Sequence, residues 1–137
     1  RWSVARRLLE QSLADAERQQ MVEEAAVSRR NLAELALWQG HPAQAIAQAQ
    51  QAEASFRSRE DARGMADAGL LRAQALLDLQ QLDQAAATLD ALVESLADGS
   101  SEQKAIAQLL RAELALARAD SAAATRALDQ ARGLAQR

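Results

Sequence analysis

The chain has 137 residues and 49% of them are hydrophobic, which is enough apolar side chain to bury the core of a single domain. Alanine fills 35 positions and tyrosine is absent, so helix formers dominate and an all-α fold is predicted. The formal net charge is −3 and there is no cysteine. The charges form no basic stripe, which argues against nucleic-acid binding, and the lack of cysteine excludes disulfides, thiolate metal sites and cysteine nucleophiles.

Seven antiparallel helices are predicted from apolar residues at helical spacing. In chain order they cover about residues 2–18, 20–39, 43–57, 59–80, 82–97 and 100–119, and a last helix starts at about Ser121. Gly40 ends the second helix and Pro42 starts the third, in a turn too short for anything but antiparallel neighbours. Ser100 and Gln103 predict a capping box at the start of the sixth helix, just after Gly99. Gly64 weakens the fourth helix, which predicts either a closely packed neighbour or fraying.

Small residues recur along the chain at nearly constant spacing. Ala5, Ala45, Ala85 and Ala124 are 40, 40 and 39 residues apart, each on the second helix of a predicted pair. Leucine columns keep the same register, at Leu37, Leu77 and Leu116 on first helices and at Leu9, Leu89 and Leu128 on second helices, where Ala49 fills the fourth place. A period in this range is typical of repeats that bury their apolar faces only by stacking.

This register divides the single predicted repeat domain, residues 1–137, into an orphan second helix and three helix pairs. The orphan helix covers residues 1–19, and the pairs cover residues 20–58, 59–98 and 99–137. The middle pair carries a net charge of −5 and the last pair +2. Because the chain opens at Arg1 in the middle of a repeat, we expect a fragment of a larger protein. No apolar run reaches the roughly 20 residues that span a bilayer, so a cytoplasmic location is expected.

The segment from Leu32 to Ala52 reads LAELALWQGHPAQAIAQAQQA. It resembles a tetratricopeptide repeat, with Leu32, Ala33, Leu37, Gly40, Ala45 and Ala52 at that family's spacing. Three residues depart from the family pattern: Ala36 replaces a bulky aromatic, and Gln80 and Ala119 replace the turn glycine. The usual unit has about 34 residues. The 40-residue unit therefore resembles the longer variety found in bacterial signal-transduction transcription regulators and in arrays attached to kinases, cyclases and response regulators.

The resemblance implies a right-handed solenoid of antiparallel helix pairs whose concave face, lined by the first helix of each pair, binds a peptide, protein or small ligand. It implies no catalysis. No cofactor and no metal are expected in this chain. The side chains placed on that face by the period are Arg30, Asn31, Glu34, Trp38, Asp67, Gln74, Asp78 and Glu113, together with the apolar residues Leu37, Leu70, Ile106 and Leu109. The acidic residues among them disfavour the carboxylate-clamp type of ligand, so a cationic or mixed ligand is expected.

Each candidate site also has a purely structural interpretation. Trp38 is either a binding hot spot or a side chain packed over the next repeat, and Trp2 is expected to cover the exposed end of the array. Arg30 and Glu34 are spaced for an ion pair on the helix surface, unless Arg30 anchors an acidic peptide. His41 is the only histidine and has no second ligand, so it is interpreted as a turn residue.

Three functions are compatible with this pattern. The first is a protein-interaction or ligand-sensing module of a larger bacterial regulatory protein, with a transcription regulator as the leading class. The second is an oligomerisation scaffold, since both ends of the array expose apolar faces that could pair two copies. The third is an accessory domain of a kinase, cyclase or other enzyme whose catalytic part lies outside this chain. No phosphate loop, nucleophile elbow or Ser-His-Asp set can be assembled, so the fragment itself is not expected to be an enzyme.

Overall fold

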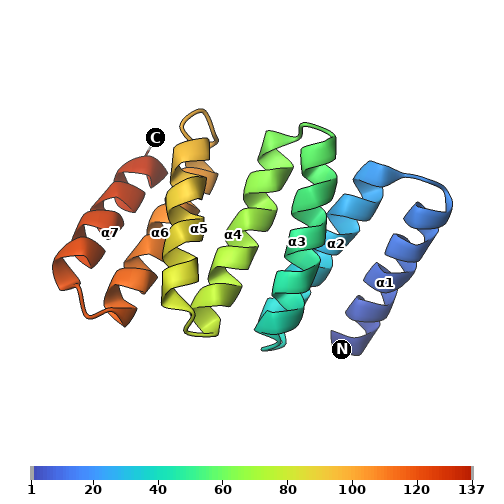
Figure 1. Ribbon diagram of the computed structural model, residues 1–137, viewed down its shortest axis with the longest axis horizontal. Helices are drawn as coiled ribbons and strands as arrows, with labels where there is room; N and C mark the ends of the chain where they lie inside the picture. The colour runs from blue at the N-terminus through green and yellow to red at the C-terminus, as the bar shows by residue number, and fades with distance from the viewer. Residues whose placement is uncertain (1, 137) are drawn as a thin grey trace. The chain divides into compact units, whose positions relative to one another are not determined.

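A computed structural model describes residues 2–136, and it folds them into seven α-helices (Figure 1). The helices are α1 (Trp2–Arg18), α2 (Val22–Trp38), α3 (Pro42–Ser58), α4 (Ala62–Asp78), α5 (Leu82–Ser95), α6 (Ser101–Ala117) and α7 (Ser121–Ala135). No strand occurs within residues 2–136, so the predicted all-α class with seven helices is confirmed. None of the helices in this range is long and apolar enough to cross a membrane.

The chain groups into two compact units, residues 1–75 and residues 76–137, with the boundary inside α4. In the first unit α2 packs against α1 and α3, and in the second unit α6 packs against α5 and α7. Within each unit these neighbours run antiparallel (Figure 1). Short turns impose this arrangement, because a connection of a few residues can only fold one helix back along the other.

Five of the turns between helices share one backbone geometry. Each of these turns contains one residue with a left-handed backbone. In chain order these residues are Gln20 (φ 57°), Gly40 (φ 78°), Glu60 (φ 55°), Gln80 (φ 60°) and Ala119 (φ 58°). At the last of these turns Ala119 N donates to Leu116 O at 3.0 Å, and Asp120 N donates to Ala115 O at 2.8 Å. This pair of hydrogen bonds is the Schellman motif, which satisfies carbonyl groups at the end of a helix. Of the five residues only Gly40 was expected to adopt this conformation.

Ala119→Gly is expected to raise the free energy of unfolding by about 1 kcal/mol, because a left-handed backbone crowds the Cβ of an L-residue but not glycine. The reverse change, Gly40→Ala, is expected to lower it by about 1 kcal/mol. An added Cβ at Gly40 meets no atom within 4 Å, so this pair isolates the backbone effect from packing. Urea denaturation measures both changes. An Ala119→Gly variant no more stable than the parent chain contradicts the assignment of this turn.

Helix ends are closed by side chains at three other places. Ser100 Oγ accepts a hydrogen bond from Gln103 N at 3.1 Å, which confirms Ser100 as the predicted cap of α6. Asp120 caps α7 by accepting from Ala123 N at 3.0 Å, and Asp61 accepts from Gly64 N at 2.9 Å in the first turn of α4. Such caps replace the hydrogen bonds that the first amides of a helix cannot make within it.

Small side chains lie where the helices approach one another. Ala45, Ala85 and Ala124 are buried, whereas Ala5 in α1 is only half-buried. The corresponding first-helix positions Ala33, Ala73 and Ala112 are buried as well. Alanine at such positions allows helix axes to approach to about 8 Å. The predicted alanine columns are therefore packing residues.

One aromatic side chain anchors the core of the first unit. Phe56 of α3 is buried in a cluster with Ala26 of α2, Ala52 of α3 and Ala68 of α4. A Cβ added to Gly64 would lie only 2.3 Å from Phe56 Cδ1. The glycine therefore leaves room for the ring, and close packing is the reason for Gly64, one of the two explanations considered from the sequence.

The leucine columns are buried to different degrees along the chain. Leu89 in α5 has no exposed surface, but Leu128, at the corresponding position of α7, is 43% exposed. In the first-helix column Leu77 is buried and Leu116 is exposed. Equivalent places in the sequence period therefore carry different amounts of buried apolar surface, and the residues near the chain end are the less buried ones.

Candidate interaction surfaces

A stripe of partly exposed residues follows one face of α2. Val27, Arg30, Glu34 and Trp38 are three or four residues apart, so their side chains lie along one side of the helix. Val27 and Trp38 are exposed, and Arg30 and Glu34 are half-buried. We call these four residues the α2 stripe. It combines an apolar end, an ion pair and a large aromatic, which is the mixture common at protein interfaces.

Arg30 is held in place by two neighbours on its own helix. Its Nη1 donates to Glu34 Oε2 at 2.6 Å and to Asn31 Oδ1 at 3.0 Å. The predicted ion pair between Arg30 and Glu34 is thus confirmed. Arg30 Nε is buried and makes no hydrogen bond with the described residues. Because Glu34 already compensates the charge of Arg30, the pair offers a ligand both a fixed carboxylate and a fixed guanidinium.

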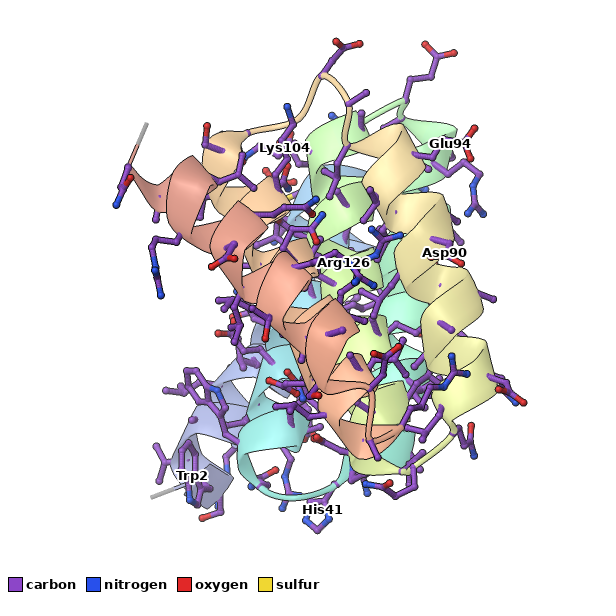
Figure 2. All side chains as sticks on the ribbon, turned by 90° about the vertical axis from the view of Figure 1, so that its left-hand side faces the viewer. Trp2, His41, Asp90, Glu94, Lys104 and Arg126 are labelled. Atoms are coloured by element: carbon purple, nitrogen blue, oxygen red, sulfur yellow. The ribbon has the colours of Figure 1, made fainter. Side chains whose placement is uncertain are left out.

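Trp38 and Trp2 form an aromatic pair, a contact that was not predicted from the sequence. Their ring centroids are 6.0 Å apart and the rings are tilted by 54°, an arrangement that aromatic pairs favour. Both rings remain accessible, at 64% exposure for Trp38 and 45% for Trp2. A signal was present in the sequence: both residues lie 18 positions from the turn residue Gln20, and residues equally far from a helix turn meet across an antiparallel pair. Figure 2 shows Trp2 at the start of α1.

The remaining predicted site residues are distributed over other helices. Asp67 and Gln74 are half-buried residues of α4 in the first unit, and Asp78 and Glu113 are exposed residues of the second unit. All four already take part in interactions within the chain. Within the first unit, the structure brings together Arg30, Asn31 and Glu34 by hydrogen bonds.

A second exposed stripe follows α6 in the second unit. Ile106, Leu109, Glu113 and Leu116 are exposed and lie along one side of the helix. We call these residues the α6 stripe. Its residues lie 79 positions after Val27, Arg30, Glu34 and Leu37. Both helices therefore carry an exposed apolar residue at the first of these places, Val27 or Ile106, and a glutamate at the third, Glu34 or Glu113. Exposed large apolar side chains gathered on one face mark interaction surfaces.

His41 is exposed in the turn between α2 and α3, where its side chain makes no capping hydrogen bond, and Figure 2 shows the ring pointing outward. Within residues 2–136 no group of three or more histidine, cysteine or acidic side chains is placed to hold a metal ion. Both stripes expose apolar surface, and the α2 stripe adds the hydrogen-bonded charges of Arg30 and Glu34.

Comparison of the sequence with protein-family models, with curated proteins and with solved structures finds no match in any of the three.

Proposed function

We propose that this chain is a protein-interaction or ligand-sensing module of a larger bacterial regulatory protein, with a transcription regulator as the leading class. Its helix pairs stack as a right-handed solenoid similar to tetratricopeptide arrays. Support comes from α1 to α4, which all have 17 residues and start at intervals of 20 residues. Further support comes from the shared turn geometry at Gln20, Gly40, Glu60, Gln80 and Ala119. Such regularity is typical of stacked repeats.

The observation that carries the proposal is the exposed Trp38 at the end of the α2 stripe. Burying a tryptophan ring on binding gains more than burying any other side chain, and Trp is enriched at interface hot spots. The ring lies on the same helix face as Arg30 and Glu34, whose charges are fixed by their hydrogen bond. A ligand of mixed character therefore fits best, with an apolar group against the tryptophans and a cationic group against Glu34.

Affinity capture from a lysate of the bacterium that encodes the chain tests this surface. We expect the double variant Arg30→Ala, Trp38→Ala to capture at least about 30-fold less partner than the parent chain does. This is the size of effect that truncation of a hot spot produces. Leu128→Ala is the matched control, because it also removes an exposed apolar side chain but lies on α7. Identical partner sets from the parent and the double variant reject the α2 stripe as the binding surface.

An oligomerisation scaffold is the second candidate function, and exposed apolar residues of α1 favour it. Val4 and Leu8 are more than half exposed and lie four residues apart on one side of the helix. Pairing of two copies through this face would remove both side chains from water. Light scattering at high protein concentration decides between the candidates. A strictly monomeric parent chain refutes the scaffold, and a dimer that Val4→Ser, Leu8→Ser converts to monomer supports it.

A further inference from the structure

The second unit contains a pocket of about 300 Å³ that is lined mainly by α6 and α7. Its floor is apolar and includes Leu114, Ala115 and Ala127. Three arginines line it as well, Arg111 and Arg118 from α6 and its end, and Arg126 from α7. The one carboxylate in the lining is Asp120, which already caps α7 through Ala123 N. The lining residues thus carry a net positive charge.

Two of the arginines form ion pairs with exposed aspartates, and water strongly screens the attraction within each pair. Arg111 Nη2 donates to Asp90 Oδ1 at 2.9 Å, and Arg118 Nη2 donates to Asp83 Oδ1 at 2.7 Å. Both aspartates belong to α5 and are highly exposed, Asp90 at 72% and Asp83 completely. Exposed ion pairs of this kind contribute little, so an anion in the pocket can share or replace them at small cost.

Arg126 is the unsatisfied member of the three. It makes no hydrogen bond or ion pair with any other residue of the range 2–136. In Figure 2, Arg126 lies on the side of α7 toward α5, the helix that also carries the labelled Asp90. A guanidinium beside a pocket, with five donor hydrogens and no carboxylate partner, is a ready binding group for an oxyanion.

The corresponding place in the first unit shows that helix packing alone does not require these arginines. A smaller pocket of about 170 Å³ is lined there by residues of α1, α2 and α3. The residues 79 positions before the three arginines are Leu32, Gln39 and Ala47, and all three line this smaller pocket. Its one basic residue, Arg6, faces Glu10 at 4.0 Å. The residues that line the pocket are thus neutral overall in the first unit, and those that line the corresponding pocket in the second unit carry a net positive charge.

We propose that the pocket of Arg111, Arg118 and Arg126 binds a small organic dianion, such as a dicarboxylate or a phosphomonoester. The guanidinium groups supply charge-assisted hydrogen bonds to the oxyanion, and the apolar floor contacts its carbon chain. This site uses none of the residues of the α2 stripe, so it goes beyond the proposed interaction surface and does not depend on it.

Titration of the full chain with succinate and with glycerol 3-phosphate at low salt tests the site, with backbone amide chemical shifts as the readout. We expect saturable shifts for residues 108–130 with at least one of the two probes, and none for the pocket of Leu32, Gln39 and Ala47. Arg126→Gln is expected to weaken binding about 10-fold or more, as for loss of a charge-assisted hydrogen bond. The Arg126→Gln variant leaves the buried core unchanged, because the side chain of Arg126 is exposed.

Arg132→Gln is the matched control, because it removes the same charge from an exposed position of α7 outside the pocket. It is expected to change the affinity less than 2-fold, because Arg132 does not line the pocket and donates no hydrogen bond to the ligand. The neutral analogue succinamide is expected not to bind. Three results overturn the proposal: no saturation with either probe, equal weakening by Arg126→Gln and Arg132→Gln, or binding of a glutamate-rich peptide without binding of the small dianions.

Discussion

Phe56→Ala is expected to lower the free energy of unfolding of the first unit by about 3–5 kcal/mol, the range for removing a buried phenylalanine ring. Phe56 is the only phenylalanine of the chain, and its ring is buried among alanines of α2, α3 and α4. Alanine neighbours cannot move to fill the space that the ring leaves, so a cavity term adds to the lost transfer free energy. Urea denaturation followed by far-ultraviolet circular dichroism measures the change.

Gly64 provides an internal control for this prediction. Gly64→Ala alone is expected to destabilise by about 1–3 kcal/mol, because the new methyl group would overlap the Phe56 ring. In the Phe56→Ala background the same methyl group enters the vacated space, so its cost should disappear. Gly133→Ala, where nothing lies within 4 Å of the added Cβ, should instead stabilise α7 by about 0.5 kcal/mol. Additive effects of Phe56→Ala and Gly64→Ala contradict the contact.

Leu89→Ala is expected to destabilise the second unit by about 2–5 kcal/mol, because this side chain is completely buried. Leu128→Ala makes the same chemical change at the corresponding place of the period, where the side chain is 43% exposed. We expect it to cost at most about 1 kcal/mol, since much of its apolar surface already contacts water. The two variants therefore show the effect of burial on stability, because the substitution and the position in the helix are the same in both.

Thermal and urea denaturation of the two variants provide the comparison. Equal destabilisation by Leu89→Ala and Leu128→Ala contradicts the burial difference between α5 and α7. Such a result would mean that Leu128 is covered in solution, for example by a second copy of the chain, and the concentration dependence of the melting temperature would then reveal the association.

The helices and their order could be predicted from the sequence because apolar spacing, Gly40, Pro42 and Ser100 are local signals. The helix bounds were predicted to within three residues. The turns at Gln20, Glu60, Gln80 and Ala119 were not recognised as left-handed, since none of these residues prefers that conformation. Their geometry follows from the hydrogen bonds of the preceding helix and from the packing of the next one, and neither is visible in single residues.

The candidate site was less predictable, because it depends on which residues meet across helices. The contact between Arg30 and Glu34 lies within one helix and could be read from their spacing. The contact between Trp2 and Trp38 joins two helices, and it requires the exact turn position to be known. The basic pocket was missed for a related reason. Arg111, Arg118 and Arg126 are seven and eight residues apart, and only the packing of α6 against α7 brings them around one pocket.

The location of both tryptophans, Trp2 and Trp38, determines which part of this protein intrinsic fluorescence can follow. Both tryptophans belong to the first unit, and residues 76–137 contain no tryptophan, tyrosine or phenylalanine. Intrinsic fluorescence therefore reports on the first unit alone, whereas far-ultraviolet circular dichroism reports on the helices of both units. Coincident transitions by the two signals would mean that the units unfold together, and a dichroism change at constant fluorescence would be the unfolding of the second unit by itself.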